Sequence, residues 1–251
     1  PDEQDEAIRD YIHERDAQKK CLKAIKQRIG ALCNRQGLKY DGGYWTKKHI
    51  DWLKHLSFPN EIFKSVLETQ LLEFEHVTEK IEEMDRKIDE FAEMDKYRES
   101  VHKLTCFKGI KTLTALAVIV EIGDFARFMK AKNFVAFLGL SVGEQSSSND
   151  HNQGGITKQG NCYIRRLLTE AAQCFSRATS TKSKALKERQ EGNSAEIIAY
   201  ADKGNERLRK RYYHLVNHNM KNQNEAKTAV ARELACFIWG MMTGNIHTAL
   251  S

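Results

Sequence analysis

The chain has 251 residues, with 40 lysines and arginines against 34 aspartates and glutamates, which gives a formal net charge of +6. With only 2 prolines and 15 glycines among many Ala, Leu, Lys and Glu residues, a mainly α-helical protein is expected. The 6 cysteines are scattered without a CxxC pair, which excludes a dense disulfide framework and argues against a zinc site. Neither a signal peptide nor a long apolar run is visible, so we expect a cytoplasmic protein with no membrane partner.

The charge is distributed unevenly along the chain. Residues 61–100 hold 13 acids and 6 bases, whereas residues 141–232 hold 16 bases and 9 acids. This asymmetry is typical of a polyanion-binding portion attached to an assembly portion, although two solvated surfaces would look the same on charge alone.

The first hundred residues are expected to be long helices. Residues 1–36 carry apolar side chains at helical spacing, the DGGYW stretch breaks the pattern, and residues 46–56 form a short helix. Residues 61–100 repeat apolar or large side chains three and four apart, which is the a/d pattern of a coiled coil. We therefore predict a coiled-coil assembly region at 1–100 that makes a homo-oligomer, a dimer or a tetramer, through residues 61–100. The first helix folding back is the alternative partner. The repeated positions are Phe63, Leu67, Gln70, Phe74, Val77, Ile81, Met84, Ile88 and Phe91.

A compact helical domain is predicted at residues 101–251. Near its start, a turn at Lys108 and Gly109 precedes the apolar helix LTALAVIVEIG, and a second helix follows. The pattern is similar to a helix-hairpin-helix unit, whose turn can offer backbone N–H groups to a DNA phosphate. Lys111 stands where such a hairpin usually has its second glycine, and a plain helical turn is the alternative.

The stretch from Gly139 to Leu168 is the most distinctive part of the sequence. Three serines, 146 to 148, lie in a polar run without helical or strand periodicity, so a loop is expected. A punctuated segment and the helix CYIRRLLTEAAQCF follow. Hydroxyls and a flexible backbone before a helix start, with cations behind them, suit a phosphate group. A solvated linker is the alternative. The candidate phosphate-binding residues are Thr157, Lys158, Asn161, Arg165 and Arg166.

Beyond this stretch, residues 180–224 are polar and basic, and end in NERLRKRYYHLVNHNMKNQ. Bases and tyrosines alternate there, as on many nucleic-acid-binding surfaces, although an exposed basic helix has the same composition.

Three strings carry a resemblance to a known family: FKGIKTLTALAVIVEIGDFARFMKAKNFVAFLGL, SSSNDHNQGGITKQGN and IRRLLTEAA. Together they resemble the C-terminal transposase domain of the insertion sequence 110 family, to which the Piv-type DNA invertases are related. The similarity runs from about Leu104 to Ala172, and the terminal helix ARELACFIWGMMTG also fits. The resemblance implies a DNA recombinase that cuts and rejoins strands at the ends of an insertion element and at its target. Some family members are also guided by a structured RNA.

In this family a serine of the C-terminal domain is the nucleophile. Alignment from Gly139 places it at Ser147, but Ser148 stands where the family usually has glycine, so Ser146 and Ser148 are alternatives. The resemblance also implies Mg2+, which is held by an acidic tetrad on an N-terminal resolvase-like domain. We expect none to be bound by this chain, because residues 1–60 show no such sheet.

Because the chain starts at Pro1 with a long helix, we expect it to begin just after that domain. On its own it should bind DNA and assemble, but cleave poorly. A non-catalytic helical DNA-binding and oligomerisation module is the alternative function, and a coiled-coil scaffold without nucleic acid is a third.

Overall fold

A computed structural model describes residues 2–147, 150–177, 179 and 181–246, and for residues 144–154 it describes the backbone only. The described residues are mainly α-helical, which confirms the mainly α class predicted from composition. They form two compact units, one of residues 10–88 and one of residues 1–9 with 89–251. No helix in the described part of the chain combines the length and the apolar character that crossing a membrane requires.

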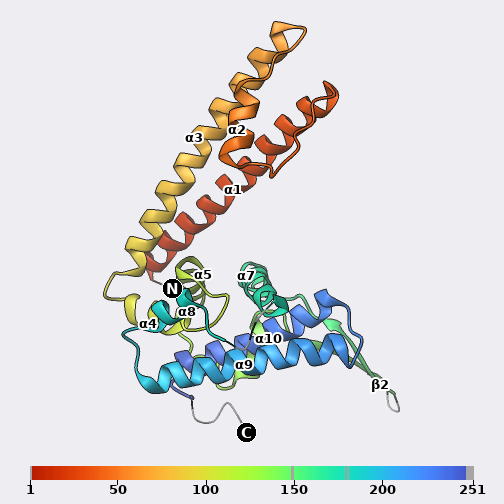
Figure 1. The fold of residues 1–251 in the computed structure, drawn as a ribbon. Helices are drawn as coiled ribbons and strands as arrows, with labels where there is room; N and C mark the ends of the chain where they lie inside the picture. The colour runs from red at the N-terminus through yellow and green to blue at the C-terminus, as the bar shows by residue number, and fades with distance from the viewer. Residues whose placement is uncertain (1, 148–149, 178, 180, 247–251) are drawn as a thin grey trace. The chain divides into compact units, whose positions relative to one another are not determined.

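The unit of residues 10–88 is built on two long helices, α1 (Glu3–Arg35) and α3 (Glu61–Ala92). Within this unit the two helices lie side by side and run antiparallel (Figure 1). Arg15 pairs with Asp85 at 2.8 Å, and Arg28 with Glu73 at 2.7 Å, so the start of α1 meets the end of α3. Their shared core contains Leu22, Ile25, Ile29 and Leu32 of α1 with Leu67, Leu71, Phe74, Val77 and Ile81 of α3.

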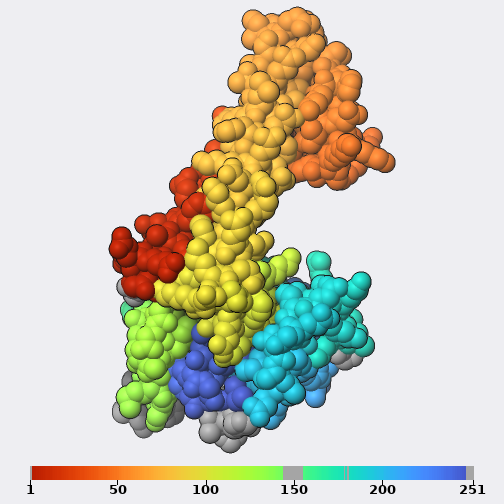
Figure 2. All heavy atoms as spheres, turned by 90° about the vertical axis from the view of Figure 1, so that its left-hand side faces the viewer, coloured from red at the N-terminus to blue at the C-terminus, as the bar shows by residue number. Residues whose placement is uncertain are grey.

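A short helix, α2 (Lys47–Lys54), lies between them in the chain and adds Leu53 to the same core. Thr46 begins it, and the Thr46 side chain accepts a hydrogen bond from the backbone N–H of His49. In the space-filling view, the orange segment between α1 and α3 bulges from the side of α3 (Figure 2). This segment widens one end of the helical hairpin.

The periodic residues of α3 are buried inside this single chain. Leu67, Phe74 and Ile81 are at most 9% exposed, and they face α1 and α2. The prediction that this seam joins a second subunit is therefore wrong for these positions. Helix α1, the alternative partner that the sequence left open, is as long as α3 and covers these positions. Self-association would have to use other surfaces of the chain.

The second unit is organised around α10 (Gln223–Met242), which packs mainly on α6, α7 and α9 and also contacts α4. Small residues allow α9 and α10 to approach closely. Gly204 of α9 faces Phe107 and Phe237, and Gly240 of α10 faces the Tyr200 hydroxyl. The other helices of this unit are α4 (Arg98–Thr105), α5 (Thr112–Ile122), α6 (Ala131–Phe137), α7 (Cys162–Ala172), α8 (Lys184–Gln190) and α9 (Ala195–Asn217), with a 3-10 turn at Gln173–Arg177.

Candidate functional site

The serine run forms a β-hairpin instead of the loop expected from the sequence. Strand β1 (Val142–Ser147) pairs antiparallel with β2 (Asp150–Ile156), with Val142 opposite Ile156 and Ser147 opposite Asp150. The strands consist almost entirely of polar residues and glycine, so they carry no alternation of apolar and polar side chains for a sequence pattern to detect. Ser146 lies opposite His151. Ser148 is outside the described residues.

Backbone hydrogen bonds join the base of this hairpin to the segment that follows α6, and Asn161 N–H donates to the carbonyl of Phe137, the last residue of α6, at 3.0 Å. Thr157 N–H donates to the Ser141 carbonyl at 2.9 Å, and Lys158 N–H donates to the Gly139 carbonyl at 3.1 Å. Lys158 has a φ of +56°, an uncommon conformation for a residue with a side chain. The side chains of Thr157 and Lys158 are exposed, so both remain available to a ligand.

Asn161 has a structural role at the start of α7. Its Oδ1 accepts from the backbone N–H of Ile164 at 2.9 Å, which caps the helix. Its Nδ2 donates to Glu121 Oε2 on α5 at 2.8 Å. Both ends of the Asn161 amide are therefore engaged within the protein. Glu121 was missed by the sequence analysis, although a single acid within the apolar helix LTALAVIVEIG was a usable signal.

The two adjacent arginines of α7 have different surroundings. Half-buried Arg165 donates from Nη1 to the Leu138 carbonyl at 2.9 Å and so holds the connection between α6 and β1. Exposed Arg166 pairs with Glu170 at 3.1 Å, and its guanidinium lies 5.0 Å from the centre of the Tyr163 ring. Arg165 therefore stabilises the base of the hairpin, while Arg166 lies on the surface of α7.

The structure places Ser147 and Lys158 at opposite ends of the hairpin and not in one site. Ser147 is five residues along β1 from Val142, or about 17 Å away at about 3.4 Å per residue. Lys158 lies just beyond Ile156, at the opposite end of the hairpin. One phosphate group cannot contact both residues in this conformation, so any shared role requires an extended nucleic-acid strand or a movement of the hairpin.

The turn at Lys108 and Gly109 is packed against α7 and α9. Gly109 has a φ of +88°, and a Cβ there would collide with the Ala171 carbonyl oxygen. Lys108 N–H donates to Asn205 Oδ1 at 2.7 Å. Lys111 precedes α5 and its side chain is exposed. Packing alone explains the glycine, so the predicted phosphate contact has no support beyond the exposed lysine.

The basic segment of α9 is not a continuous surface of bases and tyrosines. Tyr212 is only 4% exposed and faces the core. Arg209 and Lys210 both pair with Glu206, and Arg207 pairs with Glu233 of α10. Much of the positive charge of this helix is therefore neutralised within the protein.

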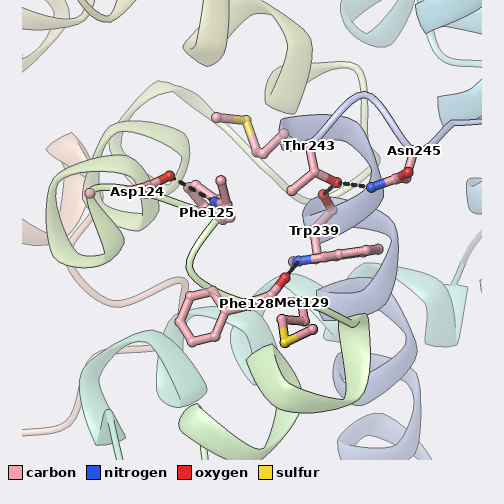
Figure 3. Close-up of a pocket in the computed structure, with 10 residues that line it drawn as sticks. Asp124, Phe125, Phe128, Met129, Trp239, Thr243 and Asn245 are labelled. Carbon is pink, nitrogen blue, oxygen red and sulfur yellow. Dashed lines mark hydrogen bonds between the residues drawn. The ribbon is translucent and has the colours of Figure 1, made fainter.

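A cavity of about 560 Å³ opens between the segment after α5 and the end of α10 (Figure 3). Its polar groups bond to each other. Trp239 Nε1–H donates to the Phe128 carbonyl at 3.0 Å, and Asn245 Nδ2–H donates to Thr243 Oγ1 at 2.8 Å. Because these groups are satisfied, the cavity offers few free donors or acceptors.

Two of the cysteines, Cys106 and Cys174, are poorly suited to act as thiol nucleophiles. Burial raises the pKa of Cys106 and that of Cys174 to about 11, so both thiols are protonated at neutral pH. Within the described ranges, no three His, Cys, Asp or Glu side chains come together as a set that could hold a metal ion.

Comparison with known proteins gives the class of the molecule. Residues 101–188, which run from within α4 to within α8 and include the β-hairpin, match the family model of the transposases of the IS116/IS110/IS902 family. The chain is similar to the transposase for insertion sequence element IS1533 of Leptospira borgpetersenii, with 33% identity over 223 residues, which are 86% of this chain and 63% of that protein.

The chain is also similar to two further transposases. The transposase y4qE of Sinorhizobium fredii is 30% identical over 242 residues, which are 96% of this chain and 58% of that protein. The transposase for insertion sequence element IS1111A of Coxiella burnetii is 33% identical over 122 residues, which are 46% of this chain and 33% of that protein. The matched segment therefore belongs to the IS116/IS110/IS902 family of transposases, and the chain spans about three fifths of the length of the first two relatives.

Proposed function

We propose that this chain supplies the serine nucleophile and part of the DNA-binding surface of an insertion-element transposase. The supporting observation is the position of the serine run. It occupies the far end of a hairpin, and the base of that hairpin is fixed to α6 and α7 within the family-matched segment. Ser147 is the proposed nucleophile, with Ser146 and Ser148 as alternatives.

The proposed reaction is a transfer of a DNA phosphodiester to serine. The serine oxygen forms a bond to phosphorus, the bond from phosphorus to a sugar oxygen breaks, and the serine proton is taken by a base while the leaving oxygen is protonated. The phosphoserine link preserves the bond energy, so reversal onto another strand rejoins the DNA. Cations near the phosphate would stabilise the charge that develops in the transition state.

The candidate phosphate-binding residues have different proposed roles. Exposed Thr157 and Lys158 at the hairpin base, and exposed Lys111 before α5, contact phosphates along the bound strand, whereas Asn161 and Arg165 hold the hairpin base in shape through Glu121 and Leu138. Arg166 lies on the surface of α7 beside Glu170, where a phosphate could replace the carboxylate.

The intact enzyme would use Mg2+ to activate the attacking and leaving oxygens. We assign no described residue of this chain to that ion, since these residues form no cluster of acidic ligands. The DNA of the element ends and of the target, a structured guide RNA, and further copies of the chain are the proposed partners.

The test looks for a covalent protein–DNA adduct. The chain is incubated with Mg2+ and DNA carrying the element ends, together with full-length protein bearing Ser147→Ala to supply the acidic domain. An adduct that maps to Ser147 of the shorter chain is expected. Exposed Lys184, on α8, gives the control variant Lys184→Ala, which should form the adduct normally.

Two results would contradict this assignment. If the full-length Ser147→Ala protein forms the adduct by itself, another serine is the nucleophile. If the chain binds DNA but gives no adduct, while unmutated full-length protein reacts, the chain is a non-catalytic DNA-binding and assembly module.

A further inference from the structure

A second candidate site lies in the unit of residues 10–88, where the end of α1 meets α2 and the segment between them. A cavity of about 180 Å³ opens there, lined mostly by aromatic and apolar side chains. Pockets for drug-sized ligands measure about 300–1,000 Å³, so this cavity is large enough for one small ring system only. Its aromatic walls are Tyr40, Tyr44, Trp45 and Trp52, around His49.

His49 is the polar centre of this aromatic cluster and is only 3% exposed. Its ring is stacked with Trp52 at 5.7 Å between centroids and lies 4.8 Å from Tyr40 and 4.9 Å from Tyr44. Burial lowers the pKa of His49, so its ring is neutral at pH 7.

The hydrogen bonding of His49 leaves one donor for a ligand. The backbone N–H of Trp45 lies 3.1 Å from His49 Nδ1 and can only donate, so Nδ1 accepts. The proton of the neutral ring is then on Nε2. Across the described residues, no protein acceptor is bonded to this nitrogen. A group with a hydrogen-bond acceptor is therefore the natural partner of Nε2–H.

The backbone at Trp45 is held in an uncommon conformation to make this arrangement. Its φ is +65°, a region that residues with side chains rarely adopt. The Trp45 ring is fixed by Lys26, whose Nζ lies 5.2 Å from the ring centre, and by Phe74, whose ring centre is 5.5 Å away. Strain of this kind persists only where the surrounding structure enforces it, and it is concentrated at binding sites.

The charged residues beside the cavity are mostly basic. Four exposed cations, each within three residues of a lining residue along the chain, form no ion pair with any described acid: Arg35, Lys39, Lys47 and Lys48. Two exposed acids, Asp41 and Asp51, lie within the same distance along the chain. The excess of positive charge disfavours a cationic ligand, of the kind an aromatic cage can hold, and favours a ligand with negative groups. Tyr44, at 60% exposure, offers an aromatic ring to solvent beside these cations.

We propose that this cavity binds an unpaired nucleobase of a single-stranded nucleic acid, stacked on Tyr44 and hydrogen-bonded to His49 Nε2–H. Lys39, Lys47 and Lys48 contact the adjoining phosphates. Every base offers a flat ring face and at least one acceptor, so this site is tolerant of sequence. The inference does not depend on the serine chemistry, because it concerns the other compact unit.

The test measures binding of the full chain to fluorescent single-stranded DNA and RNA oligonucleotides by anisotropy, and then maps photo-crosslinks from thio-substituted bases. Tyr44→Ala should weaken binding at least about five-fold, the lower limit for loss of one base–aromatic stack. Tyr44→Phe keeps the ring and should retain affinity. Leu72→Ala, which removes another exposed large side chain of the same unit, is the matched control.

Three further experiments distinguish binding of the base from electrostatic attraction between the lysines and the phosphates. Replacing the three lysines by Ala should reduce the slope of log K against log salt by about 2, since each single-strand phosphate contact contributes about 0.7. An oligonucleotide with abasic sugars should bind more weakly than the intact strand. Crosslinks should fall within residues 29–53, the range that lines the cavity, also in the Ser147→Ala variant. Whichever oligonucleotide binds more tightly, DNA or RNA, identifies the kind of nucleic acid that supplies the base.

The proposal is overturned if Tyr44→Ala and Leu72→Ala bind equally well, if the abasic strand binds as tightly as the intact one, or if the crosslinks map only outside residues 29–53. None of these results bears on the adduct at Ser147, so failure here and failure of the proposed transfer reaction are distinguishable.

Discussion

Asn161 donates a hydrogen bond from its Nδ2 to Glu121 Oε2 over 2.8 Å, and this contact fixes the start of α7 to α5. The same Asn161 side chain caps α7 through Ile164 N–H. Because the base of the serine hairpin directly precedes this cap, the Glu121 contact helps to determine where the hairpin begins. The residue most easily taken for a phosphate ligand is thus part of the scaffold.

Replacing Asn161 should therefore affect stability before it affects DNA binding. Asn161→Ala removes the cap and leaves Glu121 without this donor, so the free energy of unfolding should fall by about 1–3 kcal/mol. Urea denaturation at pH 7 measures this loss. DNA affinity, measured well below the melting temperature, should change little. Weaker DNA binding with unchanged stability would instead show a direct contact.

A second substitution isolates the Glu121 contact. Asn161→Asp keeps an oxygen for the cap but places a carboxylate against Glu121. We expect it to be less stable than wild type at pH 7, and Glu121→Gln should restore part of the loss. Equal effects of Asn161→Asp alone and with Glu121→Gln would contradict the contact.

Gly109 should be required for packing. Its φ of +88° is strained for any other residue, and an added Cβ would collide with the Ala171 carbonyl oxygen. Gly109→Ala should cost at least about 1–3 kcal/mol of unfolding free energy, measured by chemical denaturation. Gly155→Ala, where an added Cβ meets nothing within 4 Å, is the matched control and should be close to neutral. A stable Gly109→Ala protein that has lost DNA binding would favour the helix-hairpin-helix interpretation.

The crossing of α9 and α10 predicts a coupled pair of substitutions. Tyr200 Oη donates to the Phe237 carbonyl at 3.2 Å, and the same hydroxyl blocks the space beside Gly240. Gly240→Ala should destabilise the protein by about 1–3 kcal/mol through overpacking. Tyr200→Phe alone should cost about 1 kcal/mol through the lost hydrogen bond. The double variant should lose less than the two costs added together, because the missing hydroxyl makes room for the new methyl group. Strict additivity in denaturation experiments would contradict the contact.

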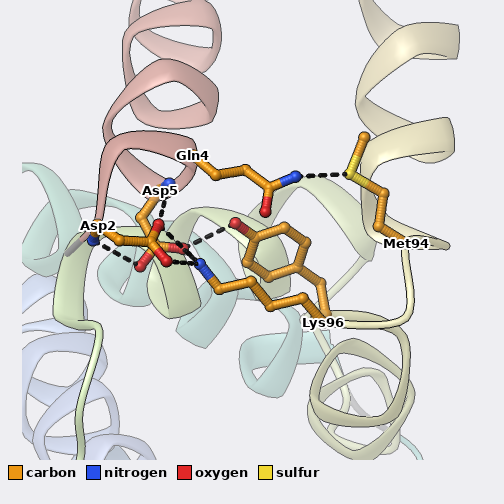
Figure 4. A network of polar contacts seen from close by, with 6 residues as sticks. Asp2, Gln4, Asp5, Met94 and Lys96 are labelled. Carbon is orange, nitrogen blue, oxygen red and sulfur yellow. Dashed lines mark hydrogen bonds and ion pairs between the residues drawn. The ribbon is translucent and has the colours of Figure 1, made fainter.

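The first turn of α1 should make stability depend on acid pH. Lys96 Nζ lies 2.6 Å from Asp5 Oδ1 and 2.7 Å from Asp2 Oδ2, and the buried Tyr97 hydroxyl donates to Asp5 at 2.7 Å (Figure 4). Burial raises the pKa of Asp5, but the hydrogen bonds from Lys96 and Tyr97 outweigh burial and lower it below 3.8.

A carboxyl group with a lowered pKa stabilises the fold above its unfolded pKa, and that stability is lost as the pH falls through the folded pKa. Wild type should therefore lose stability from about pH 4 downward. Asp5→Asn should be less stable at pH 7 and show a flatter decline in acid, measured by melting temperature against pH. Asp2→Asn, at a more exposed carboxylate, should have a smaller effect. An unchanged acid profile in Asp5→Asn would exclude this network as the cause.

The helical content and the buried faces were predictable from the sequence because they depend on local spacing. The apolar repeat of α3, from Leu67 to Ile88, predicted a buried stripe, and those residues are buried. The spacing of apolar residues shows that one face of α3 is buried but not which segment covers it. Both α1 and a second subunit were therefore compatible with the repeat. Likewise, the serine hairpin has backbone pairing without an apolar face, and such strands leave no periodic pattern.

The sequence by itself therefore determined the fold class, the family resemblance and the segment that contains the candidate serines. Only the tertiary structure decided that Asn161 and Arg165 serve the scaffold, that Lys158 lies at the opposite end of the hairpin from Ser147, and that His49 is surrounded by aromatic rings. The physical reason is that helix periodicity arises from neighbours within a turn or two. The partners of a polar side chain, such as Glu121 for Asn161, are supplied by segments distant in the chain.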